Sequence, residues 1–288
     1  MSKATEINAL IRLLDDEDPN VYKNVTNKLI SYGKEVVPML ESVWEDDFNP
    51  AVHERIENLI HQINFESVKT QLKDWIADEE HNLLNGALIV ASYHFSDVKK
   101  EHVQLMVSQI KQKIWLELHD YLTPLEQVNV FNQIFYGLLG FGGSYSQKPE
   151  MRDYCVNYVL ESKNGTSISL GLIYMIIAHE LQLPIYGVLL NRHFVLSYQK
   201  RFIQDFTQDY AEESVFYINP MNKGMVFQRE EIKTYLKSLK QEPQTSDYTP
   251  ASNKLIVLEL LKYLLHYFSS NDELQKVEEI QLLIELFE

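Results

Sequence analysis

The segment from Asn164 to Tyr198 contains a hydroxyl and an imidazole where acyl-transfer enzymes have a nucleophile and a general base. Ser167 stands at the start of an apolar segment typical of a buried helix, and His193 opens a run typical of a strand. In thiol acyl-transfer enzymes the nucleophile is a cysteine, whose pKa is lowered by the helix end and by a nearby base. A serine gains much less, because its hydroxyl stays protonated at neutral pH without a strong base. The residue at position 167 therefore largely decides between an enzyme and an inactive relative of one.

A helix and three strands are expected to position these side chains. The helix predicted over 168–181 is apolar on nearly every face, which indicates that it is buried in the middle of a domain. Ser167 is the expected N-cap residue of this helix, since serine favours that position. A Leu-Pro break ends the helix. One strand is expected after that break, a second over 193–198, and a third over 215–218.

Several short motifs of this region resemble the transglutaminase-like superfamily, and most closely its SirB-type branch. That branch has the pattern G-[NTI]-P-I-S-L-x-x-x-Y, then a Leu-Pro break, then G-H-F, then D-P-F. The matching residues here are Gly165 to Leu170 with Tyr174, Leu183-Pro184, Arg192-His193-Phe194, and Asn219-Pro220-Met221. A stretch over 131–141 is also similar, so the resemblance covers about residues 83–240.

The resemblance implies a papain-like fold and a catalytic set of cysteine, histidine and aspartate. Aligned on Pro184, the cysteine position falls on Ser167, the histidine on His193 and the aspartate on Asn219. The base is therefore kept, the nucleophile is replaced, and the orienting acid has become an amide. Cys155 lies 12 residues before Ser167 on the preceding segment and is not expected to replace it.

Each of the three residues also has a structural explanation. Ser167 can cap its helix, His193 can bond to backbone or line a binding cleft, and Asn219 can cap a turn. An amide can orient a histidine, but a Ser-His-Asn set lacks the charge that stabilises imidazolium. We therefore expect a degenerate, non-catalytic module that binds a protein or peptide or has a regulatory role. A peptidase or amidase that uses Ser167, His193 and Asn219 is the alternative.

The regions on either side are predicted to be helical. Residues 1–64 contain a weak repeat of about 30 residues, in which Asp18-Pro19 and Asn49-Pro50 each start a helix. The repeat resembles a HEAT repeat, which predicts either a binding surface or an ordinary helical cap on the main domain. We expect HEAT-like hairpins over 1–64, a transglutaminase-like domain over 65–240, and a linker with C-terminal helices over 241–288. The expected fold class is α+β and mainly helical, with a buried helix packed on a small antiparallel sheet.

Composition limits the classes of function. The chain has 41 acidic and 26 basic residues, and its net charge of -15 would repel the backbone of DNA or RNA. A single cysteine allows no internal disulfide and fits a reducing compartment. The first residues do not resemble a signal peptide, and no apolar run approaches the length that spans a bilayer. Phosphate-binding and dinucleotide motifs are absent, and the histidines lack metal-ligand spacing. We expect a cytoplasmic protein with no metal, cofactor, membrane or nucleic-acid partner.

Overall fold

The computed structural model describes residues 3–16, 18–46, 49–143, 148–190 and 193–288. The chain divides into two compact units, Met1–Asp74 and Trp75–Glu288. Helix α4 (Pro50–Ala77) runs through the junction, so the boundary that we expected after residue 64 falls inside a continuous helix. Among the described residues, no helix is both long and apolar enough to cross a membrane.

The first unit is built from α1 (Lys3–Arg12), α2 (Pro19–Tyr32), α3 (Val37–Asp46) and most of α4. The two predicted helix starts are confirmed. Asp18 Oδ1 accepts from the N–H of Asn20 at 2.8 Å, and Asn49 Oδ1 accepts from the N–H of Ala51 at 3.1 Å. Buried apolar side chains from all four helices make a core that belongs to this unit. Its likeness to HEAT repeats stays a prediction.

The second unit combines helices with a small sheet, which confirms the mainly helical α+β class. Its helices are α5 (Leu83–Ala91), α6 (Lys100–Trp115), α7 (Pro124–Asn132), α8 (Val156–Ser162), α9 (Ser167–Glu180), α10 (Arg229–Ser238), α11 (Asn253–Ser269) and α12 (Leu274–Ile284). Its strands are β1 (Gly142–Gly143), β2 (Asn164–Gly165), β3 (Ile185–Leu190), β4 (His193–Gln199), β5 (Ser214–Asn219) and β6 (Met225–Phe227). The core helix and the three long strands lie where the sequence predicts them, whereas β6 was not predicted.

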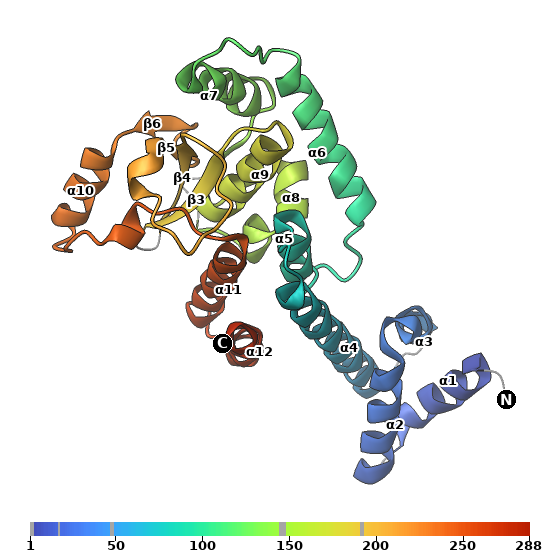
Figure 1. Ribbon diagram of the computed structural model, residues 1–288. Helices are drawn as coiled ribbons and strands as arrows, with labels where there is room; N and C mark the ends of the chain where they lie inside the picture. Colours follow the sequence, from blue (N-terminus) through green and yellow to red (C-terminus); the bar gives the residue numbers. More distant parts are fainter. Residues whose placement is uncertain (1–2, 17, 47–48, 144–147, 191–192) are drawn as a thin grey trace. The chain divides into compact units, whose positions relative to one another are not determined.

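Strands β3 to β6 form an antiparallel sheet in the order β3-β4-β5-β6. Helix α9 packs on β3 and β4, and Figure 1 shows the strands lying between α9 on one side and α10 on the other. The second face is covered by Ile232 and Leu236 of α10, which belong to the same apolar cluster as Val188 and Val195. The sheet is therefore buried on both faces, and this fixes the direction of every side chain along β4.

Helix α9 is the centre of the second unit. Its residues from Ile168 to Ala178 are all buried, as its uniformly apolar sequence predicts. Tyr174 is fully buried, stacks on Phe131 with ring centroids 3.8 Å apart, and donates its hydroxyl to Asn132 Oδ1 at 3.1 Å. Asn132 in turn donates to the carbonyl of Gly224 at 2.8 Å. These contacts tie α9 to α7 and to the turn between β5 and β6, which fixes the elements around its N-terminus.

Candidate functional site

The three residues singled out by the sequence lie around one cavity of about 880 Å³, which we call the site cavity. Ser167 enters it from the start of α9, His193 from the start of β4 and Asn219 from the end of β5. The register that pairs Leu196 with Ile218 brings Val195 opposite Asn219, so His193 and Asn219 share a sheet face. The fold thus gathers three residues from a segment in which the first and the last, Ser167 and Asn219, are 52 positions apart.

Ser167 is not the N-cap of α9, and the expectation that it caps this helix is wrong. The cap is Thr166, whose Oγ1 accepts from the N–H of Ser169 at 3.4 Å, while the N–H of Thr166 donates to Ser169 Oγ at 2.9 Å. This reciprocal pair is a capping box, in which a second serine replaces the usual Glu or Gln. Buried Ser169 also donates to the carbonyl of Asp153 at 2.6 Å. Ser167 is left at the first helical position, half-buried, with its side chain on the cavity.

The hydroxyl of Ser167 interacts with Tyr263 of α11. Burial raises the pKa of the Tyr263 phenol, and a hydrogen bond with Ser167 opposes that increase. A neutral phenol is a weak base, so it cannot activate a serine as an imidazole does. The backbone N–H groups of Ser167 and Ile168 find no acceptor among the described residues, as is usual at the first turn of a helix. Of these two residues, Ser167 lines the cavity.

His193 is solvent-exposed at the cavity mouth and packs on an aromatic ring. Its imidazole meets Tyr235 of α10 edge-on, with centroids 5.5 Å apart and an interplanar angle of 77°. Partial burial lowers the pKa of His193 below its ordinary value, so the ring is neutral at pH 7. Within the described parts of the chain, no hydrogen bond joins His193 to Ser167 or to Asn219. The base and the nucleophile position are present in one cavity, but they are not linked.

Asn219 holds a turn. Its Oδ1 accepts from the N–H of Met221 at 3.0 Å and from the N–H of Asn222 at 3.2 Å, which fixes the chain as it leaves β5. The amide oxygen is therefore used locally, and it carries no negative charge that could stabilise an imidazolium. Of the two explanations that the sequence left open for Asn219, the structure shows the turn cap.

Phe194 explains which face of the sheet His193 occupies. Its ring lies between Gly171 of α9 and Gly187 of β3. A Cβ added at Gly171 would be 2.4 Å from Phe194 Cε1, and one added at Gly187 would be 2.5 Å from Cζ. Because strand side chains alternate, a Phe194 that packs toward α9 directs His193 to the opposite face, against Tyr235. The glycines are therefore required by the close approach of one ring.

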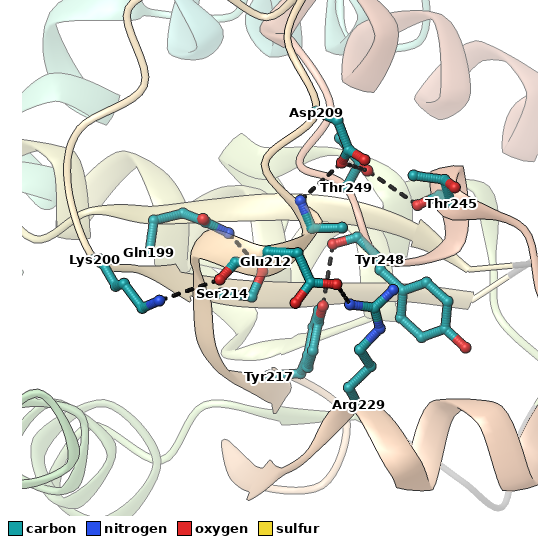
Figure 2. Close-up of polar contacts among 11 residues, drawn as sticks. Gln199, Lys200, Asp209, Glu212, Ser214, Tyr217, Arg229, Thr245, Tyr248 and Thr249 are labelled. Atoms are coloured by element: carbon teal, nitrogen blue, oxygen red, sulfur yellow. Dashed lines mark hydrogen bonds and ion pairs between the residues drawn. The ribbon is translucent and has the colours of Figure 1, made fainter.

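A second group of contacts holds α10, the helix that carries Tyr235. Figure 2 shows Arg229, at the start of α10, in an ion pair with Glu212. The Arg229 guanidinium also lies over the Tyr248 ring, 4.3 Å from its centroid. Tyr217 of β5 donates its hydroxyl to the carbonyl of Tyr248 at 3.1 Å. These contacts fix α10 on its face of the sheet, where Ile232 and Tyr235 form part of the lining of the site cavity.

Other side chains that could do chemistry are unsuited to it here. Burial raises the pKa of Cys155 to about 12, and its Sγ faces Met151, so this thiol is inert. The Nε2 atom of His179 is buried, and its ring packs on Tyr186 with the centroids 5.0 Å apart. Burial accordingly lowers the pKa of His179. No cluster of metal-ligating side chains occurs in the described ranges.

The sequence did not identify Tyr235, Tyr263 or Met225 as residues of the site. Tyr235 and Met225 lie on elements whose approach to β4 depends on the β5–β6 turn, and Tyr263 belongs to a helix that was placed outside the domain. Their positions in amphipathic or very short segments give no local signal for a cavity. Only the fold brings them beside Ser167 and His193.

The cavity has a mixed lining. Hydroxyl and amide groups, tyrosine rings and apolar side chains surround one volume. Within the described residues, no hydrogen bonds connect a nucleophile, a base and an orienting group there, as they do in enzymes that activate a serine.

Comparison with known proteins agrees with this fold. A sequence profile described as "Transglutaminase-like superfamily" matches residues 101–262, which reach into α11 and include all three site positions. A UPF0162 protein of Xylella fastidiosa strain Temecula1 is 22% identical over 204 residues, which cover 68% of each chain. A UPF0162 protein of Buchnera aphidicola is 26% identical over 155 residues, 52% of each chain.

Protein SirB1 of Salmonella typhimurium is 25% identical over 192 residues, which cover 65% of this chain and 67% of SirB1. The chain therefore spans from about half to about two thirds of the length of these relatives. No solved structure is similar at a significant level. Because the matched region contains α9, the sheet and all three site positions, and covers more than half of the chain, this protein belongs to the transglutaminase-like superfamily.

Proposed function

We propose that this protein binds a segment of another protein in the site cavity and does not catalyse a reaction on it. The observation that carries the proposal is the state of the three family positions. They surround one cavity, yet within the described residues no hydrogen bond links His193 to Ser167, and the side-chain oxygen of Asn219 caps a turn. The volume is within the range of cavities that bind ligands of several hundred daltons.

The alternative is a hydrolase of the peptidase or amidase type. It needs His193 to take the proton of Ser167 and to be stabilised as an imidazolium while it holds that proton. Asn219 is neutral and bonded elsewhere, so this stabilisation is missing. An alkoxide formed without it would be rare, and hydrolysis would be slow even with backbone donors in place.

The first unit is proposed to add contact surface for the same partner. Two of its large apolar side chains are exposed, Leu13 by 43% and Trp44 by 39%. Once a partner has been identified, replacing both side chains with serine should weaken its capture. Unchanged capture by this double variant would remove the first unit from the proposal.

A library of random peptides displayed on phage tests the main proposal, because binding and turnover can be read on the same ligands. Peptides enriched on the intact protein should bind Ser167→Ala and the wild type with similar affinity. Their masses should stay unchanged after long incubation with the protein. Ser167→Trp, which puts a large ring into the cavity beside His193, should bind them much more weakly. Cleaved or modified peptides, produced by the wild type but not by Ser167→Ala, would show instead that the site is catalytic.

A further inference from the structure

One side of the site cavity is an apolar surface that the described residues leave partly exposed. We call it the β6–α10 wall, made of Leu190, Met225, Phe227, Ile232 and Tyr235. Leu190 and Ile232 are buried in the sheet core and give the wall a fixed base, while Phe227 and Tyr235 are half-buried over them. Met225 is 48% exposed. A flexible thioether and two half-buried aromatic rings over a fixed aliphatic base suit a bulky apolar side chain of variable shape.

The wall is bordered by an open sheet edge. Strand β6 is the last strand of the order β3-β4-β5-β6, and within the described residues its outer edge pairs with no other strand. An unpaired edge can accept the backbone of an extended peptide, whose alternate side chains then point into the neighbouring pocket. This edge favours an extended polypeptide over a compact small molecule as the occupant.

The charged side chains that line the cavity have partners within the chain, and one of them, Asp153, accepts from the N–H of Glu150 at 2.9 Å. The pairs are Lys148 with Asn271 at 2.9 Å, Arg152 with Glu150 at 2.8 Å, and Glu231 with the N–H of Gln228 at 2.7 Å. The chain as a whole carries a net charge of -15, however, and its field attracts positively charged partners at long range. The contact at the wall is therefore expected to be apolar. The negative charge of the chain is expected to favour basic residues on either side of the apolar side chain.

We propose that the site cavity binds an extended basic segment of another protein and that one bulky apolar side chain of this segment packs on the β6–α10 wall. This inference rests on the proposed function and specifies its ligand. The apolar side chain supplies the affinity by leaving water, and the Lys and Arg residues around it raise the rate of association.

Fluorescein-labelled peptides of the form Lys-Arg-Gly-X-Gly-Arg-Lys test the proposal by fluorescence anisotropy with the full chain. We expect X = Leu, Met or Phe to bind at least about tenfold more tightly than X = Ala, because several buried CH₂ groups distinguish them. Met225→Glu places a charge in the wall and should remove this preference. Leu274→Glu is the matched control, since Leu274 is 74% exposed on α12 and does not line the cavity. Raising the salt concentration should slow association of all the peptides.

Each other outcome overturns the inference. Equal affinity for X = Ala and X = Leu, or tighter binding of X = Gln or X = Glu, would exclude the apolar contact. If the peptides bound without an apolar preference and Met225→Glu still abolished their binding, the proposed function would stand. The ligand chemistry inferred here would then be wrong. If neither this series nor the random library bound in a cavity-dependent manner, the inference and the proposed function would both fail.

Discussion

The packing of Phe194 between two glycines predicts that Gly171→Ala destabilises the second unit when Phe194 is present and stabilises it when Phe194 is replaced with alanine. A Cβ at Gly171 would lie 2.4 Å from Phe194 Cε1, and a Cβ at Gly187 would lie 2.5 Å from Cζ of the same ring. The ring is 1% exposed, so it has no open side toward which it could move. Gly171→Ala alone should therefore overpack this contact, at a cost of ~2–3 kcal/mol. The better helix propensity of alanine offsets ~1 kcal/mol, which leaves a destabilisation of ~1–2 kcal/mol.

Phe194→Ala removes the ring and should destabilise the second unit by about 3–5 kcal/mol, as is typical of a buried phenylalanine. In that background the methyl group at position 171 meets no ring, and only the gain in helix propensity remains. Gly171→Ala should then stabilise the second unit by ~1 kcal/mol. The coupling free energy between the two substitutions is the difference between these effects, ~2–3 kcal/mol.

Urea denaturation can measure this cycle in the full chain. The chain has three tryptophans, Trp44, Trp75 and Trp115, and only Trp44 lies in the first unit. A Trp44→Phe background therefore makes tryptophan fluorescence report the second unit alone. A Gly171→Ala substitution with the same effect in both backgrounds would refute the described contact between α9 and β4.

Three further predictions concern the site. Ser169→Ala should destabilise the second unit by ~1–3 kcal/mol in urea denaturation, because it leaves buried polar groups unpaired, whereas Ser167→Ala should cost less than about 1 kcal/mol. Similar costs for both would contradict the capping box. Asn219→Asp keeps the acceptor of its turn and should change stability by less than about 0.5 kcal/mol, while Asn219→Ala should cost ~1 kcal/mol; the opposite order would exclude the turn role. Cys155 should resist iodoacetamide at pH 8 until the chain unfolds. Its raised pKa also means that the unfolded chain loses the thiol proton first, so stability should fall as pH rises above about 8.5. A Cys155→Ala variant should lack that component, and rapid alkylation of the folded chain would contradict the burial.

The sequence predicted the helix and strands of the site better than the contacts that its side chains make. The apolar helix after residue 167, the strand opened by His193 and the short strand before Asn219 are all found, because their periods follow from burial on one or both faces. The cap was assigned one residue too late. Thr166 and Ser169 have the three-residue spacing of a capping box, but serine at its second position is a weak signal compared with Glu or Gln.

The features that decide function depend on long-range contacts. Ser167 of α9 and Tyr263 of α11 line the same cavity although they are almost 100 positions apart, and no local pattern encodes this. Strand β6 has three residues and too few alternations to be recognised, although its Met225 and Phe227 form part of the β6–α10 wall. The need for glycine at positions 171 and 187 becomes clear only once the structure places the ring of Phe194 between them.

The most direct test of the central claim is the intact mass of the protein after exposure to a fluorophosphonate, which reacts with activated serines. A serine hydrolase in a parallel reaction confirms that the reagent is active, and Ser167→Ala shows which residue carries any adduct. We expect the wild type to keep its unmodified mass, since no imidazole or carboxylate among the described residues is hydrogen-bonded to Ser167. A stoichiometric adduct that disappears in both Ser167→Ala and His193→Ala would contradict the account and establish a working serine nucleophile.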